Sequence, residues 1–412
     1  MAVAERLVAS PTLAPARLQG IGPAEREDER LARLQLARSE NVGPRTYLHL
    51  LGRFGSAEGA MRALPELAAR GGHRSYRACE LDVAAAEVAT GEAGGARLVT
   101  LGDPDYPAKL AQIENPPPVL WTRGTTAIGA RDAVAVVGAR NASALGQRMA
   151  RRLATDLGAA GYATVSGLAR GIDAAVHEAS LESGTIAVLA GGIDRIYPPE
   201  HHTLADRILA SGGMLVTECP VGLEPTARHF PRRNRLISGL ADGVVLIEAA
   251  MRSGSLITAR HALEQGRDVM ACPGAPEDPR AGGCNQLIRD GAALVRSAED
   301  VIEALAGPQR IGFAEDGTDF LFDANGFNDE TMIDEELGLE EFKESDRKAA
   351  FAEEVFALLT AHPVDIDELS RASGASMADL SLALLELDLA GRVDIIPGGQ
   401  VALADGAFGA AS

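Results

Sequence analysis

Short apolar runs alternate with longer amphipathic stretches between residues 133 and 305. The runs are continuous and rich in valine: AVAVV (133–137), ATV (163–165), IAVLA (186–190), MLVT (214–217), GVVLIE (243–248), DVMA (268–271) and ALV (293–295). Strands that are apolar on both faces are typical of a parallel sheet covered by helices on both sides. The pattern therefore predicts an α/β fold with a doubly wound, mostly parallel sheet.

Helical spacing of apolar residues marks the region before the sheet. From about Glu29 to Leu67 the chain is rich in alanine and leucine, and the pattern is interrupted at NVGPR (41–45). A Gly-Pro step between two short amphipathic helices is consistent with a backbone-binding helical hairpin and with a plain pair of packed helices. The sequence leaves both interpretations open.

The C-terminal residues predict three helices followed by a β-hairpin. The helices cover Phe351–Thr360, Ile366–Ala372 and Leu380–Leu389, and the hairpin joins Val393–Ile396 to Gln400–Leu403 through Pro397-Gly398-Gly399. This order is typical of a winged helix. The stretch that would supply its recognition helix, 376–391, contains three carboxylates and no basic residue. We therefore expect it to contact protein or simply to pack, rather than to read a major groove.

The acidity of the chain is concentrated in one segment. The 412 residues carry a formal net charge of −19, but thirteen acidic residues and one lysine lie between Glu315 and Asp346. The stretch 131–306 holds eighteen arginines against twenty acidic residues, so net charge does not exclude a polyanionic partner. We expect a tail with an N-terminal helical domain (1–100), the α/β domain (101–306), an acidic linker (307–346) and the winged-helix-like domain (347–412).

Several kinds of site are excluded by what the sequence lacks. No lysine lies between Lys109 and Lys343, so the α/β domain cannot hold a Schiff base, a pyridoxal phosphate anchor or a Walker lysine. The four cysteines form no CxxC pair, which disfavours structural zinc and disulfides and indicates reduced thiols. With no long apolar run and no secretion signal, we expect a cytoplasmic protein with no membrane span, metal or cofactor.

Glycine- and serine-rich loops follow four of the predicted strands. They are VGARNASALG (137–146), SGLARGID (166–173), AGGIDRIYPPEH (190–201) and EAAMRSGSLITA (248–259). Glycine lets backbone N–H groups approach an anion, and the helix that follows adds partial positive charge. Arginines lie in or beside these loops: Arg140, Arg170, Arg195, Arg252 and those of HFPRRNR (229–235). Because the carboxyl ends of parallel strands meet at one edge, the loops predict an extended cradle for phosphates.

Six ordered motifs carry a resemblance to a known family. They are VGARNASALG, SGLARGIDAAVH, AGGIDRIYPPEH, TECPVGLEPTARHFPRRNRLISGLA, IEAAMRSGSLITARHALEQGRDVMACPG and GCNQLIRDGA. Within about Asp103–Ala306 the chain resembles the DNA-processing protein A family (DprA, also called Smf). The resemblance implies an extended Rossmann-like fold, with an N-terminal helical (SAM-like) domain and a C-terminal winged helix.

The resemblance also implies a function. Members of the family are non-catalytic single-stranded DNA-binding proteins that act in DNA uptake and natural transformation. They protect incoming DNA and help to load the RecA recombinase, usually as homodimers. Carried over by motif, the DNA-binding residues are Gly138 and Arg140 in the first loop, Ser166, Gly167, Arg170 and Gly171 in the second, Gly191 and Gly192 in the third, Phe230, Arg232, Asn234 and Arg235 beside the groove, and Ser253, Gly254 and Ser255 closing it.

One position departs from the family pattern. Family members often carry a basic residue near YPPEH, where this chain has Pro199 and Glu200, so the electrostatic grip depends on compensation by Arg195 or Arg207. Phe230 is the best candidate for stacking on a base, although it fits equally well as a buried loop anchor. We expect a modest affinity for single-stranded DNA that depends strongly on the salt concentration.

Two other functions remain as alternatives. A Rossmann-type nucleotide phosphoribohydrolase would use an acid and a base from among Asp173, His177, Glu218 and Glu248, which fall near strand ends. Its PGGxGTxxE signature is absent, and Asp173 is also well placed to cap a helix. A protein-interaction scaffold would suit the acidic linker but leaves the four glycine-rich loops unexplained.

Overall fold

A computed structural model of the chain describes residues 21–24, 26–71, 76–306, 351–352, 355–359, 363–375, 377–396 and 400–404. The chain divides into two compact units, which are formed by residues 1–24 with 85–310 and by residues 25–84 with 311–412. The predicted acidic linker and the turn at 397–399 lie outside the described residues. Among those described, no helix combines the length and the apolar character that crossing a membrane requires.

The first unit is built on one nine-stranded sheet with the strand order β1-β2-β6-β5-β4-β3-β7-β8-β9. The strands are β1 (Arg97–Thr100), β2 (Val119–Gly124), β3 (Ala133–Val137), β4 (Ala163–Ser166), β5 (Thr185–Val188), β6 (Met214–Thr217), β7 (Gly243–Leu246), β8 (Asp268–Ala271) and β9 (Ala293–Leu294). Each of the seven predicted apolar runs forms a strand, and β3 to β9 pair in parallel. The mostly parallel sheet is therefore confirmed. The sequence pattern missed β1 and β2, which pair antiparallel with each other.

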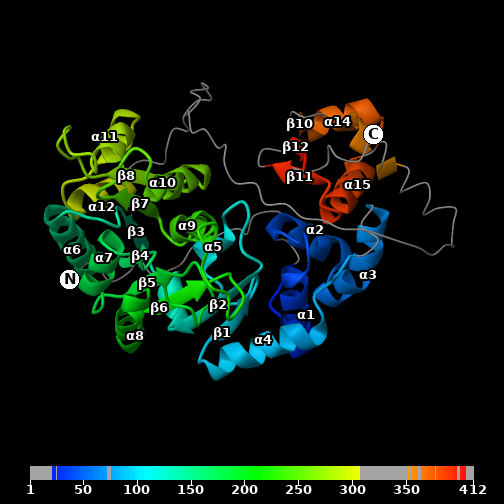
Figure 1. Ribbon diagram of the computed structural model, residues 1–412, viewed down its shortest axis with the longest axis horizontal. Helices are drawn as coiled ribbons and strands as arrows, with labels where there is room; N and C mark the ends of the chain where they lie inside the picture. Colours follow the sequence, from blue (N-terminus) through cyan, green and yellow to red (C-terminus); the bar gives the residue numbers. More distant parts are fainter. Residues whose placement is uncertain are drawn as a thin grey trace, which may run out of the picture. The chain divides into compact units, whose positions relative to one another are not determined.

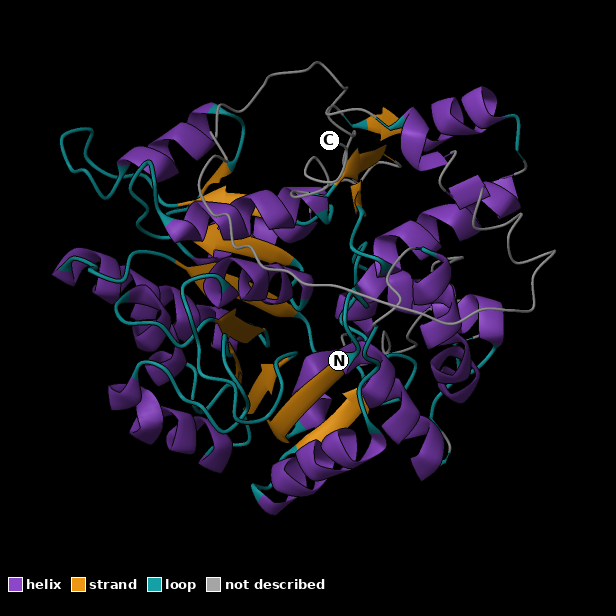
Figure 2. Ribbon diagram, turned by 45° about the vertical axis from the view of Figure 1, so that its right-hand side comes forward, coloured by secondary structure: helices purple, strands orange, loops and turns teal. Residues whose placement is uncertain are grey.

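Helices cover both faces of this sheet (Figures 1 and 2). They are α4 (Leu81–Ala93), α5 (Ala108–Ala111), α6 (Ala144–Ala159), α7 (Ile172–Ala179), α8 (His202–Ala210), α9 (His229–Gly239), α10 (Gly254–Glu264), α11 (Gly282–Arg289) and α12 (Ala298–Ala306). Helices α6, α7 and α12 share one apolar core with the buried valines of β3 and β7. Because parallel crossovers are right-handed, α9 and α10, which connect strands in the opposite direction along the sheet, lie on the other face.

The direction of the crossovers reverses between β3 and β7. Strand β3 is hydrogen-bonded to β4 on one side and to β7 on the other, and Val137 pairs with Leu246 in the same register. The loops that leave these two strands therefore start side by side and turn to opposite faces. In an open α/β sheet this point forms a crevice at the carboxyl ends of the strands, where ligands bind.

The second unit combines the N-terminal helices with the winged helix. Its elements are α1 (Glu27–Arg38), α2 (Pro44–Phe54), α3 (Ala57–Arg70), β10 (Val364–Asp365), α14 (Ile366–Ser373), α15 (Met377–Leu389), β11 (Val393–Ile396) and β12 (Gln400–Leu403). Residues 351–352 and 355–358 are also helical. The three strands form an antiparallel sheet in the order β10-β12-β11. Both predicted accessory folds are confirmed. The sequence pattern predicted neither the break at Gly55-Ser56, which separates α2 from α3, nor the two-residue strand β10.

Candidate nucleic-acid interface

A cavity of about 470 Å³ lies at the point where the crossovers reverse. Its walls come from the loops after β3 and β7, from the start of α7, and from one face of α9. The lining residues are Val137, Gly138, Ala139, Arg140, Asn141, Ala169, Asp173, Phe230, Pro231, Arg233, Asn234, Ile237, Ala250, Ser253, Gly254, Ser255, Ile257, Thr258 and Arg280. Seven of the fifteen predicted DNA-binding residues are among them: Gly138, Arg140, Phe230, Asn234, Ser253, Gly254 and Ser255.

The N-terminal end of α10 opens into this cavity. Ser253 caps the helix by accepting a hydrogen bond from the Ser255 N–H at 3.3 Å. Gly254 is exposed, and a Cβ atom added to it would meet no other atom within 4 Å. No carboxylate occurs in the first turn of this helix. The partial positive charge of the helix end is therefore available to an anion in the cavity.

An arginine and an aromatic ring form a cluster on the wall of the cavity, and a second ring outside the lining packs against them. The guanidinium of Arg140 lies over the Phe230 ring, 4.8 Å from its centroid, and the Tyr197 ring meets Phe230 edge-on at 5.5 Å. Arg140 is exposed and forms no ion pair with a carboxylate in the described part of the chain. Phe230 thus holds a free cation in place, and the guanidinium plane itself offers a surface on which a base can stack.

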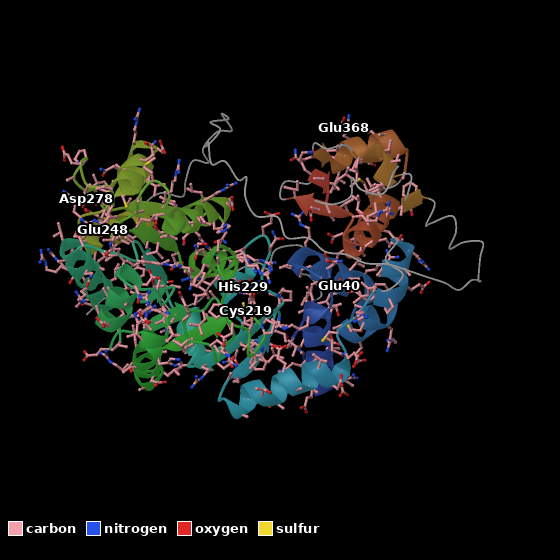
Figure 3. The ribbon with its side chains drawn as sticks, viewed as in Figure 1. Glu40, Cys219, His229, Glu248, Asp278 and Glu368 are labelled. Carbon is pink, nitrogen blue, oxygen red and sulfur yellow. The ribbon has the colours of Figure 1, made fainter. Side chains whose placement is uncertain are left out.

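Two of the four predicted anion loops are already occupied by internal carboxylates. Glu248, which follows β7, accepts a hydrogen bond from the Ser143 N–H at 2.9 Å and so closes the N-terminal end of α6. Asp173 accepts the N–H groups of Gly167 at 3.1 Å and Ala169 at 3.3 Å. In both loops a carboxylate therefore satisfies donors that the sequence analysis predicted to bind phosphate. Figure 3 shows Glu248 near α6 and Asp278 in the loop before α11.

The second glycine-rich loop (166–173) packs against the first (137–146) and holds its backbone in position. Ser166 is buried and donates to the Val136 carbonyl at 2.8 Å. Gly171 adopts a φ of 78°, and a Cβ atom there would lie 2.3 Å from the Ala139 carbonyl oxygen. Glycine is required at this position because the two loops touch through their backbones. Ser166 and Gly171 therefore fix the position of the first loop, and Ser166, Gly167 and Gly171 are not among the residues that line the cavity.

The third loop is covered by its own neighbours. The Gly192 N–H donates to the Leu223 carbonyl at 2.8 Å, and an added Cβ at Gly191 would lie 2.8 Å from the same oxygen. The Thr217 hydroxyl donates to the Gly191 carbonyl at 2.9 Å. The expectation that Gly191 and Gly192 line the groove is therefore not met by this cavity, because the segment that follows β6 packs against them.

Three of the predicted arginines are held by carboxylates. Arg170 forms an ion pair with Glu200, and Arg195 lies 3.1 Å from Asp194 and 3.0 Å from Glu224. Arg235 pairs with Glu218 and donates to the Asn115 carbonyl at 2.8 Å. Arg195 therefore does not compensate freely for the acidic residue at position 200. The hydrogen bond from Arg170 lowers the pKa of Glu200, so this carboxyl stays ionised and neutralises its partner.

Replacing Glu200 by glutamine is expected to strengthen binding of a short single strand about two- to fourfold at low salt, since it frees the charge of Arg170. Fluorescence anisotropy with a labelled oligonucleotide measures the change. The matched control is Glu264→Gln, which frees Arg260 at the far end of α10. An equal gain from both variants would show that only the net charge matters and that the Arg170–Glu200 pair has no special place.

The sequence of this chain matches described families along most of its length. The family described as DNA recombination-mediator protein A matches residues 97–306, the DprA-like N-terminal HHH domain matches 27–90, and the DprA winged helix domain matches 344–399. Protein Smf of Escherichia coli (strain K12) is 39% identical over 302 residues, which span 72% of this chain and 75% of that protein. The chain belongs to the DprA/Smf family.

Two further members of the DprA/Smf family are similar to this chain, one compared by sequence and one by structure. DNA processing protein DprA of Bacillus subtilis (strain 168) is 43% identical over 219 residues, 52% of this chain and 73% of that protein. The crystal structure of DNA processing protein A from Streptococcus pneumoniae superposes with a TM-score of 0.54 and 34% identity, and covers 66% of this chain and 95% of that one. The extended sheet described above is thus the fold of a DprA/Smf protein.

Sequence reasoning missed two arginines of this DprA/Smf cavity. Arg233 is buried and donates to the Gly167 carbonyl at 2.7 Å and to the Val188 carbonyl, while Arg280 lines the cavity and pairs with Asp278 at 3.0 Å. The signal for Arg233 was present, because Phe230, Arg233, Asn234 and Ile237 follow the i, i+3, i+4, i+7 spacing of one helical face. The predicted Arg232 and Arg235 lie on other faces of α9 and do not line the cavity.

The candidate acid and base residues of the hydrolase alternative are engaged in the fold. His177 is fully buried, its Nδ1 lies 2.8 Å from the Thr185 hydroxyl, and burial lowers its pKa to about 3. Burial raises the pKa of Asp173, while Arg233 opposes the shift. Glu218 accepts a hydrogen bond from Arg235, and Glu248 accepts one from Ser143. Within the described ranges, no cluster of three or more metal-binding side chains occurs.

Proposed function

We propose that the cavity between the β3 and β7 loops binds the sugar–phosphate backbone of single-stranded DNA without making or breaking a bond. The observation that carries the proposal is that one cavity of about 470 Å³ brings together an open α10 terminus, the Phe230 ring and Arg140, which has no ion pair among the described residues. The helix end and the guanidinium suit a phosphate, and the ring and the guanidinium plane suit a base.

The geometry favours a single strand over a duplex. Stacking requires a base that is unpaired and exposed, and the Arg140–Phe230 cluster sits on the wall of a recess that a paired base would not enter. None of the lining residues needs to distinguish one base from another, since both the phosphate and the ring face are common to all nucleotides. We therefore propose binding that tolerates any sequence and weakens steeply as salt increases.

Membership of the DprA/Smf family supports a wider role for this binding. Relatives in Bacillus subtilis and Streptococcus pneumoniae are named DNA processing protein DprA. We propose that the chain protects incoming single-stranded DNA during natural transformation and helps to load the RecA recombinase, acting as a cytoplasmic homodimer. Pairing two protomers would place two cavities on one strand, and the resulting avidity would offset the modest affinity of each.

The replacement Arg140→Ala tests the proposal directly. We expect about a tenfold loss of affinity for a single strand, because a charge-assisted contact to phosphate is removed. The slope of log affinity against log salt should become less steep by about 0.7, the value for one phosphate contact on a single strand. Anisotropy titrations over a range of salt concentrations measure both quantities.

Two further variants make the Arg140 result interpretable. Arg170→Ala should weaken binding less than Arg140→Ala, because Glu200 already neutralises Arg170. Arg152→Ala, at an exposed position in the middle of α6, should bind like the parent protein. If Arg140→Ala and Arg152→Ala both match the parent at every salt concentration, DNA does not bind in this cavity.

A further inference from the structure

Tyr197 presents an aromatic ring to solvent beside the cavity. Its side chain is 43% exposed, and it is the only aromatic residue among the large hydrophobic side chains that the described part of the chain leaves exposed. Its hydroxyl forms no hydrogen bond with any described residue. The ring and the hydroxyl of Tyr197 are thus both accessible to a ligand that arrives from solvent.

The Tyr197 ring continues the Arg140–Phe230 cluster away from the cavity. Tyr197 does not line the cavity, but its ring packs against Phe230 at 5.5 Å between centroids, with an angle of 61° between the two planes. In such an edge-to-face pair, whichever ring supplies the edge, Phe230 covers at most one face of Tyr197. At least one face of the Tyr197 ring is therefore not used by this contact.

The order of the strands places this ring farther along the same edge of the sheet. Tyr197 lies in the loop after β5 and Arg170 in the loop after β4, and the strands run β5-β4-β3-β7, as Figure 1 shows. Neighbouring strands are about 4.8 Å apart, so β5 lies about 10 Å from β3. Nucleotides of a stacked strand are about 3.4 Å apart along its axis, so this distance has room for a further nucleotide beyond the cavity.

Arg170 is the cation next to the Tyr197 ring. The hydrogen bond from its Nε to Glu200, together with the Glu200 charge, raises the pKa of Arg170, and Tyr197 adds to the rise, so the three side chains are neighbours. The two terminal nitrogens of Arg170 form no hydrogen bond within the described ranges. They can therefore donate to a phosphate, although Glu200 offsets the charge that attracts it.

We propose that Tyr197 and Arg170 form a second nucleotide subsite, in which the base next to the one on the Arg140–Phe230 cluster stacks on the Tyr197 ring. The inference rests on the proposed function, because it extends the strand bound in the cavity by one nucleotide toward β5. A ring face accepts any base, so the subsite adds affinity without adding a sequence preference. The bound strand then runs from the α10 terminus past Phe230 to Tyr197.

The test uses DNA probes that differ only in the number of bases they carry. Each probe is a single strand of about six nucleotides, most of which lack their base, with either one base or two adjacent bases retained. All probes contain the same number of phosphates, so the ionic contacts cancel when two probes are compared. Because a strand can slide along the protein, each probe places its bases on the best available rings.

The second base should strengthen binding to the parent protein about tenfold, because it reaches Tyr197. In Tyr197→Leu this gain should fall to about twofold or less, since leucine keeps apolar bulk against Phe230 but offers no ring face. Tyr197→Phe should keep the gain. The gain should be the same at low and high salt, because stacking involves no ion pair. Fluorescence anisotropy with labelled probes measures each affinity.

The one-base probe separates this subsite from the cavity. Tyr197→Leu should bind that probe within about twofold of the parent, whereas Arg140→Ala should bind it more weakly. Tyr162→Leu is the matched control, because it removes a partly buried ring at the amino end of β4, on the opposite edge of the sheet. It should keep both affinities. Fluorescence of the buried Trp121 verifies that each variant is folded.

The subsite is ruled out if the parent gains nothing from the second base or if Tyr197→Leu keeps the gain. It is also ruled out if Tyr197→Leu weakens binding of the one-base and two-base probes equally, because Tyr197 would then only support Phe230. Loss of the one-base affinity in Arg140→Ala together with any of these results leaves the cavity proposal standing. Parent-like binding of the one-base probe by Arg140→Ala would instead overturn the proposed function, and the subsite with it.

Discussion

Replacing Arg233 by methionine is expected to lower the free energy of unfolding of the α/β domain by about 3–5 kcal/mol. Arg233 is 6% exposed and donates to the backbone carbonyls of Gly167 and Val188. Its charge also opposes the rise that burial imposes on the pKa of Asp173, which is itself 6% exposed. Methionine has a similar volume but leaves a buried carboxylate without its cation and removes the Arg233 donor from two backbone carbonyls.

The single tryptophan of the chain makes this measurement specific. Trp121 is fully buried in β2, so its fluorescence follows unfolding of the sheet that contains the candidate site. Denaturant titrations of the full chain should give a lower midpoint for Arg233→Met, while Arg232→Met, at the exposed neighbouring position, should unfold like the parent.

A double substitution decides whether the charge of Asp173 causes the loss. Adding Asp173→Asn to Arg233→Met removes the uncompensated carboxylate, so part of the lost stability should return. A loss below about 1 kcal/mol for Arg233→Met alone would mean that Asp173 is protonated in the folded protein and that the buried pair is not ionic. No recovery in the double variant would assign the loss to the backbone carbonyls instead.

Gly254→Asp is expected to reduce single-stranded DNA affinity by about 100-fold while leaving the fold intact. The new carboxylate would stand at the open end of α10, as Glu248 stands at the end of α6. Two like charges about 5 Å apart near a protein surface repel by about 3 kcal/mol, which accounts for this loss. The helix itself should be stabilised, because a negative charge in its first turn is favourable.

Gly254→Ala is the matched control for this charge. An added methyl group meets no atom within 4 Å, so the fold should accept it and the DNA affinity should fall only slightly. Anisotropy measures the affinity and Trp121 fluorescence measures the stability of each variant. Parent-like binding by Gly254→Asp would remove the α10 terminus from the DNA site, and equal losses in both variants would show that the site excludes bulk rather than negative charge.

The sequence by itself determined the architecture and the edge of the sheet where the candidate site lies. Continuous valine-rich runs separated by helices permit little other than a parallel sheet buried on both faces, because every strand must bury both of its sides. The carboxyl ends of parallel strands meet by geometry, so loops such as 137–146 and 248–259 had to lie together once the sheet was recognised. The order of three helices and a β-hairpin near the C-terminus likewise predicted the winged helix, because each of these elements can be recognised from its local sequence pattern.

Only the tertiary structure decided which donors and charges in those loops are free. Glu248 accepts a hydrogen bond from Ser143, 105 residues away in the sequence, and Glu200 accepts one from Arg170, 30 residues away. Each contact occupies a donor that the motifs alone suggested was available to DNA. Short-range patterns encode which groups a loop contains, whereas folding brings distant carboxylates to them and leaves Arg140 and the α10 terminus open.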